Sequence, residues 1–300
     1  MAYPTSVRIV EVGARDGLQN EASVTTEQKI NLINALCDAG LKDIEAGAFV
    51  SPKWVPQMAD SSDVIKGLGI HPGVTFSALT PNLKGAEAAL EVGIKEFAIF
   101  TAASEAFTQK NINCSIDESI ERFKPVVELA KQHGVKVRGY ISCVLGCPYQ
   151  GEVKPEVVLD VCKQLLAMGC YEVSLGDTIG VGTPNNVQSL LTLLLEHISA
   201  DKLAVHFHDT YGQALANISK ALEMGISTVD SAVAGLGGCP YAKGASGNVA
   251  TEDVVYLLQG LGIDPQIDLE RLAKAGWAIC EALNKPPVSK VSLALKAKCD

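Results

Sequence analysis

The chain has 300 residues, 47% of them hydrophobic and 20% charged, which is the composition of a folded globular protein and not of a disordered one. The formal net charge of -9 argues against a nucleic-acid partner, because phosphate binding requires a basic face and the lysines form no cluster. No apolar run approaches the roughly eighteen residues of a membrane span, so a membrane is not an expected partner either.

The amino-terminal residues lack a basic-then-apolar signal, which predicts that the protein stays in the cytoplasm. The nine cysteines include no Cys-x-x-Cys pair, and we expect most of them to be reduced and buried as small apolar residues.

In chain order, helical stretches repeatedly end in a glycine that precedes an apolar run, as at Gly40, Gly69, Gly93, Gly134, Gly169 and Gly225. Glycine takes the left-handed conformation that commonly ends a helix, and the intervals suit the roughly 30 residues of a βαβ unit. The predicted strands cover residues 7–12, 43–46, 74–78, 96–101, 135–142, 172–175, 203–208 and 228–233.

Eight strands alternating with amphipathic helices predict a (β/α)8 TIM barrel, with a doubly wound open sheet as the alternative. One further helix is expected over residues 268–283, where Pro286 and Pro287 end it. We therefore expect a catalytic barrel over residues 1–262 and a C-terminal helix and tail over residues 263–300.

In such a barrel the chemistry lies at the carboxyl ends of the strands, and several ionisable residues fall there. His206 and His208 are two apart on a predicted strand, so their imidazoles point to the same side, as metal ligands do. The alternative is a pair of polar residues that bond their neighbours. Arg15 and Asp16 follow the first strand and favour the metal hypothesis.

The loop after the eighth strand, residues 235–248, contains five glycines and matches neither common phosphate-binding motif. We expect it to be a mobile lid over the site. Cys239 lies within it, where an accessible thiol can carry a proton, although a structural cysteine is the alternative.

Asp16, His206, His208 and Asn248 would offer two nitrogens and two oxygens to a divalent cation. Such a set favours Mg²⁺ or Mn²⁺, with zinc as the alternative. Arg15 beside the ion could stabilise an oxyanion, a combination suited to breaking or forming a carbon–carbon bond next to a carbonyl.

Glu45 and Asp177 follow the second and sixth strands and could accept a proton or orient water. Their alternative role is structural, either in supporting the metal ligands or in an ion pair at the rim of the barrel.

Four segments, residues 13–21, 49–57, 174–180 and 235–248, together resemble the 3-hydroxy-3-methylglutaryl-CoA (HMG-CoA) lyase family. The resemblance extends from residue 7 to about residue 261 and is most specific around Cys239. It implies cleavage of the acyl-CoA substrate to acetyl-CoA and acetoacetate, in leucine degradation and ketone-body formation, by a homodimeric enzyme.

The resemblance also implies the roles of individual residues. Asp16, His206, His208 and Asn248 would bind the metal, Arg15 would hold the thioester carbonyl and stabilise the enolate, and Cys239 would protonate the product. His206, Glu45 and Asp177 are candidates for the base that takes the substrate's hydroxyl proton, and the sequence does not rank them.

Two departures from the family stand out: the small residues 46–48 after Glu45, which leave the preferred acyl group open, and the lack of an organelle presequence, which predicts a bacterial, cytoplasmic enzyme. Three alternatives remain: a synthase that condenses acetyl-CoA with a 2-oxo acid, a lyase for a related 3-hydroxyacyl-CoA, and a catalytically silent metal-binding scaffold. A methylene group in a pocket discriminates by only about 1 to 3 kcal/mol.

Overall fold

A closed barrel of eight parallel strands forms the centre of the molecule in the computed structural model, which describes residues 3–238 and 247–298. Neighbouring strands pair in sequence order, and β1 closes the barrel against β8. The strands are β1 (Arg8–Glu11), β2 (Asp43–Ala48), β3 (Thr75–Leu79), β4 (Glu96–Ala102), β5 (Lys136–Ser142), β6 (Glu172–Asp177), β7 (Leu203–Phe207) and β8 (Thr228–Ser231). The predicted (β/α)8 barrel is confirmed, and each expected strand overlaps an observed one.

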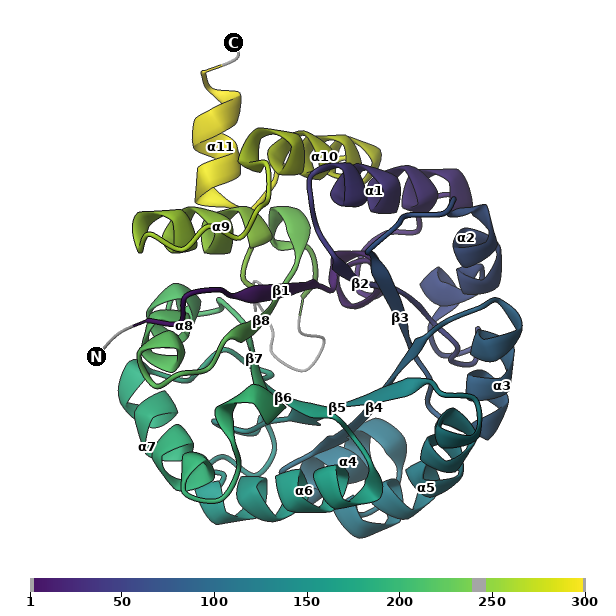
Figure 1. Cartoon of the computed structure of the whole chain (residues 1–300), viewed down its shortest axis with the longest axis vertical. Coiled ribbons are helices and arrows are strands. Elements are labelled where there is room, and N and C mark those ends of the chain that lie inside the picture. Colours follow the sequence, from purple (N-terminus) through teal and green to yellow (C-terminus); the bar gives the residue numbers. More distant parts are fainter. Residues whose placement is uncertain (1–2, 239–246, 299–300) are drawn as a thin grey trace.

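All helices except the last one surround the barrel as an outer ring (Figure 1). The described residues form eleven α-helices. They are α1 (Thr26–Asp38), α2 (Ser61–Gly67), α3 (Leu83–Glu91), α4 (Glu105–Ile112), α5 (Ile116–Gln132), α6 (Pro155–Met168), α7 (Pro184–Leu195), α8 (Ala214–Glu223), α9 (Thr251–Gly260), α10 (Leu269–Ala282) and α11 (Lys290–Lys296). Of the glycines expected to end helices, all but Gly69 have a positive φ. α2 ends at Gly67 and Leu68 already has the β conformation, so Gly69 lies beyond the end of the helix.

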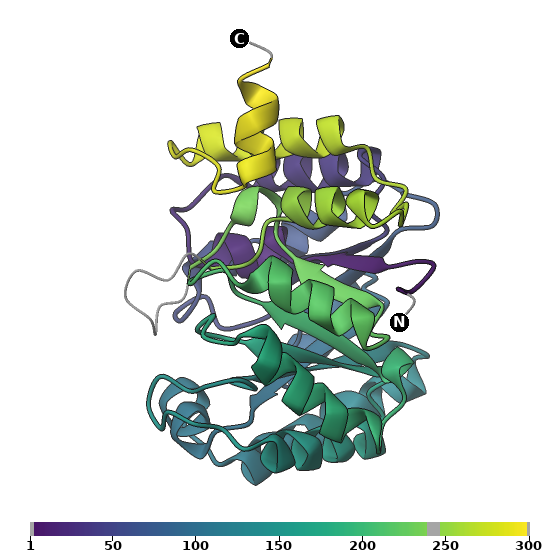
Figure 2. The same cartoon turned by 90° about the vertical axis from the view of Figure 1, so that its left-hand side faces the viewer.

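The chain beyond the barrel contains two helices, where one was expected. α10 agrees with the predicted helix and begins at Asp268, whose carboxylate accepts hydrogen bonds from the backbone of Glu270 and Arg271. α11 was not predicted, because seven residues are too few to hold a helix by themselves. Contacts with α9 and α10 stabilise it: the Trp277 indole donates to Ser292 at 2.8 Å. Figures 1 and 2 show α11 outside the ring of helices. The boundary between the barrel and the C-terminal segment at residue 262 stays a prediction.

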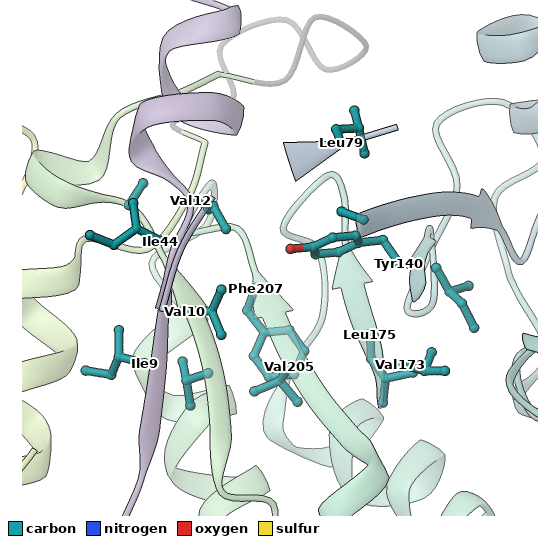
Figure 3. Close-up of a cluster of buried hydrophobic side chains, with 14 of the residues drawn as sticks. Ile9, Val10, Val12, Ile44, Leu79, Tyr140, Val173, Leu175, Val205 and Phe207 are labelled. Carbon is teal, nitrogen blue, oxygen red and sulfur yellow. The ribbon is translucent and has the colours of Figure 1, made fainter. Parts of the chain in front are cut away.

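Apolar side chains pack on both sides of β1. Val10 on β1 and Val12 just after it project toward the ring of Tyr140 on β5, whereas Ile9 projects to the other side of the strand (Figure 3). This alternation is the two-residue period of a strand.

The described cysteines are buried except Cys37, which is half-buried. No described helix is both long and apolar enough to cross a membrane.

Candidate active site

Two histidines and one aspartate converge at the carboxyl ends of β7 and β1. His206 lies on β7 and His208 directly follows it, while Asp16 lies on a π-helical turn (Gly13–Gly17) after β1. The Nε2 atoms of the two histidines are 3.4 Å apart, and Nε2 of His206 is 3.9 Å from Oδ2 of Asp16. One ligand atom from each of the three lies within 4.8 Å of the others, a spacing that suits one shared cation. We call Asp16, His206 and His208 the triad.

Asn248 reaches the triad because the chain after the glycine-rich loop pairs with the end of β7. Residues 208 and 248 form an isolated antiparallel bridge, and the amide of Val249 donates to Phe207 at 3.2 Å. The Asn248 side-chain nitrogen donates to Oδ2 of Asp16 at 2.8 Å and to the carbonyl of Leu236 at 3.2 Å. Asn248 therefore lies beside the triad, but its nitrogen, and not its oxygen, faces Asp16.

Arg15 connects the triad to Glu45 on β2. Its Nη1 donates to Oδ1 of Asp16 at 2.7 Å, and its Nε donates to Oε2 of Glu45 at 2.7 Å. Burial alone would raise the pKa of Asp16, but the charges of Arg15 and His206 lower it to about 2. Asp16 is therefore a carboxylate at neutral pH, as a metal ligand must be.

The two imidazoles have different environments. Burial and the neighbouring His206 lower the pKa of His208 to about 4, so that ring is neutral. Burial also acts to lower the pKa of His206, but the hydrogen bond to Asp230 and the charge of Asp16 raise it above its ordinary value. Asp230 lies on β8 and was not among the sequence candidates. The signal that could have identified Asp230 from the sequence is a charged residue within a buried strand.

Glu45 has one oxygen engaged and one available. Oε2 is held by Arg15, whereas the buried Oε1 has no hydrogen-bond partner within the described part of the chain. Burial raises the pKa of this carboxyl group, although Arg15 acts in the opposite direction. An acceptor with a raised pKa beside a cationic group is an arrangement that can take up a proton.

Asp177 is turned toward the loop after β6. Its Oδ2 accepts a hydrogen bond from the amide of Gly182 at 2.8 Å, and its Oδ1 accepts one from Val181 at 3.2 Å. Burial raises the pKa of Asp177 to about 6. Among the residues that the structure describes, no hydrogen bond or ion pair connects Asp177 to the triad, so its visible contacts hold the β6–α7 loop in place.

Cys239 lies outside the described residues. The chain on its amino-terminal side is attached to the loop after β1, where the amide of Gly237 donates to Glu21 at 3.3 Å and Asn20 donates to the carbonyl of Gly238 at 3.1 Å. The segment that carries Cys239 therefore starts next to the loop that carries Arg15 and Asp16.

Fold and site together define a (β/α)8-barrel enzyme class with a candidate metal centre at the carboxyl ends of its strands. The HMGL-like family model matches residues 6–279. The chain belongs to this family, as its sequence motifs indicated.

Named relatives match over nearly the whole chain. A Pseudomonas aeruginosa 3-hydroxy-3-isohexenylglutaryl-CoA/hydroxy-methylglutaryl-CoA lyase is 60% identical over 99% of this chain and 100% of its own. The mitochondrial hydroxymethylglutaryl-CoA lyase of Bos taurus is 59% identical over 97% of this chain and 90% of its own.

Solved structures agree with the fold. A hydroxymethylglutaryl-CoA lyase from Pseudomonas aeruginosa superposes with a TM-score of 0.98, at 60% identity over 99% of this chain and 100% of that one. An Acinetobacter baumannii HMG-CoA lyase, determined in complex with coenzyme A and 3-methylmalate, gives a TM-score of 0.92 at 36% identity over 98% of this chain and 96% of that one.

Proposed function

We propose that this protein is a hydroxymethylglutaryl-CoA lyase, which cleaves 3-hydroxy-3-methylglutaryl-CoA to acetyl-CoA and acetoacetate. The observation that carries the proposal is the triad beside the Arg15–Glu45 pair, in a chain about as similar to bacterial as to animal lyases. An acyl-CoA is the expected substrate, and an HMG-CoA lyase of the same fold was determined with coenzyme A bound.

Asp16, His206 and His208 would hold the metal, and Asn248 would join them if its amide turned its oxygen toward the ion. Nitrogen and oxygen donors without a thiolate favour Mg²⁺ or Mn²⁺ over softer cations. The three converging donor atoms, an ionised Asp16 and a neutral His208 all fit such a cation. When bound, the cation would polarise the substrate oxygens that face it.

Glu45 is the proton acceptor that the geometry favours. The substrate's hydroxyl proton would pass to Oε1 of Glu45, the buried oxygen without a partner among the described residues. Asp177 is a weaker candidate, because both of its oxygens accept backbone hydrogen bonds. His206 is weaker as well, since its Nε2 is one of the atoms that would bind the cation.

Arg15 and Cys239 would act on the part of the substrate that becomes acetyl-CoA. As the hydroxyl oxygen becomes the ketone of acetoacetate, the bond between C2 and C3 breaks and its electron pair forms the enolate of acetyl-CoA. The guanidinium of Arg15 would stabilise the enolate oxygen, because a fixed cation in a buried site stabilises charge that develops during the reaction. The thiol of Cys239 would then protonate the carbon, as the family resemblance implies.

The test is acetoacetate release by metal-stripped protein, with and without Mg²⁺ or Mn²⁺, alongside a Cys239→Ala variant. Activity that returns with metal and is lost in the variant supports the lyase, the ion and the thiol. Acetoacetate formed equally well without metal would refute the metal's role. Absence of acetoacetate under all conditions would refute the lyase and direct attention to a 2-oxo-acid synthase.

A second candidate substrate carries a longer branch at C3. The relative from Pseudomonas aeruginosa that matches this chain end to end is named for 3-hydroxy-3-isohexenylglutaryl-CoA as well as for the methyl compound. In this chain Glu45 is followed by the small, buried Ala46, Gly47 and Ala48. Measuring kcat/KM for both substrates separates the two possibilities, since a closed pocket would reject the isohexenyl group.

The cellular setting also belongs to the proposal. From the family resemblance we infer a role in leucine degradation, a cytoplasmic location and a homodimer. The bovine relative is named as mitochondrial, so location varies among the relatives of this chain. Fractionation of the source cells and light scattering of the purified protein test these points.

A further inference from the structure

A buried network of charges lies beneath the triad, inside the barrel. Asp230 on β8 is the cross-strand neighbour of His206 on β7. Oδ2 of Asp230 lies 3.3 Å from Nδ1 of His206, the ring nitrogen that the triad does not use. Both side chains are buried, so water does not compete strongly for this contact.

Asp230 is itself fixed from two sides. Nη2 of Arg138 donates to Oδ1 at 2.7 Å, Nη1 donates to Oδ2 at 3.0 Å, and the hydroxyl of Ser174 donates to Oδ2 at 2.7 Å. The two parallel bonds from one guanidinium set the plane of the carboxylate as well as its position. Arg138 is held in turn by Glu172, which accepts from its Nε at 2.6 Å.

We propose that Asp230 is a positioning residue for the metal centre: it accepts a hydrogen bond from Nδ1–H of His206 and leaves the lone pair of Nε2 directed at the cation. A neutral imidazole carries one N–H, so a carboxylate that accepts from Nδ1 selects the tautomer with Nε2 unprotonated. Nε2 is the atom that faces His208 and Asp16. The inference rests on the metal site of the proposed function.

The two histidine ligands differ in this respect. His208 has a backbone partner at Thr178, and no carboxylate accepts from its Nδ1 within the described part of the chain. His206 is therefore the ligand whose tautomer a buried carboxylate sets before the metal arrives. A purely structural Asp230, present only to neutralise Arg138, would have no need to face the imidazole.

The tautomer can be measured directly in metal-free protein labelled with ¹⁵N-histidine. At a pH above the raised pKa of His206, where the ring is neutral, we expect its NMR signals to show a protonated Nδ1 and an unprotonated Nε2. In Asp230→Asn the amide can donate its own N–H to Nδ1, so we expect the tautomer to shift toward Nε2–H. The affinity for Mn²⁺, followed by electron paramagnetic resonance, should fall roughly 10- to 100-fold, as is usual when the partner of a metal-ligating histidine is lost.

Glu172→Gln is the matched control. It removes the charge of a carboxylate that also pairs with Arg138, and Glu172 forms no hydrogen bond or ion pair with His206 in the described structure. We expect its tautomer signals and Mn²⁺ affinity to stay close to those of the parent. If Asp230→Asn does not fold, the double variant Arg138→Met/Asp230→Asn removes both charges of the pair and should show the same tautomer shift.

Three results would overturn the inference. The parent protein could show Nε2–H at His206, Asp230→Asn could keep the parent tautomer and affinity, or Glu172→Gln could lose as much affinity as Asp230→Asn. None of these depends on acetoacetate release. A parent that binds no Mn²⁺ would instead refute the metal site of the proposed function, whereas the tautomer would still be measurable.

Discussion

Replacing Glu45 with glutamine isolates the proposed proton acceptor. The change keeps the shape of the side chain, and the amide oxygen can still accept from Arg15, whose Nε and Nη2 now bond Oε2 at 2.7 and 2.6 Å. The amide nitrogen then occupies the place of the free Oε1 and cannot accept a proton. Arg15 keeps its hydrogen bond to Asp16, so the guanidinium is not left without a partner.

We expect Glu45→Gln to lower kcat more than it lowers the stability of the fold. General base catalysis contributes about 10²–10⁴-fold, so kcat should fall by roughly that factor. Removing one partner of a buried ion pair costs about 3–5 kcal/mol when the other charge is left uncompensated. The cost here should be smaller, because Asp16 still pairs with Arg15 and the raised pKa of Glu45 shows that its buried charge is already unfavourable.

The assay is acetoacetate release at saturating substrate and metal, with urea unfolding and Mn²⁺ affinity measured on the same preparations. Asp177→Asn is the comparison variant, since that carboxylate accepts hydrogen bonds from the backbone of the β6–α7 loop. If Glu45→Gln keeps most of its kcat while Asp177→Asn loses it, the base has been misassigned. A pH–rate profile whose acidic limb survives in Glu45→Gln would lead to the same conclusion.

Three other variants test the site and the packing around it. Asp16→Asn should remove the rise in melting temperature that Mn²⁺ gives the parent; that rise persisting would exclude Asp16 as a ligand. Burial raises the pKa of Glu252 to about 8, so its contribution to stability is present at low pH and is lost as pH rises through 8. Glu252→Gln should therefore flatten the fall in unfolding free energy between about pH 5 and 8, and equal slopes would contradict this. Gly47→Ala would place a methyl group 2.7 Å from Oγ of Ser61 and should cost about 1–3 kcal/mol, partly recovered by adding Ser61→Gly.

The sequence predicts those parts of the molecule that show a local apolar pattern or that lie at the ends of strands. The eight strands follow from apolar runs between helical segments, and Asp16 and the His206–His208 pair follow from their places at strand ends. Glu45 was expected after the second strand but lies within β2. Asp230 could not be predicted in this way, because its role depends on facing His206 across the neighbouring strands β7 and β8. α11 could not be predicted from a local pattern either, since contacts distant in sequence stabilise that short helix.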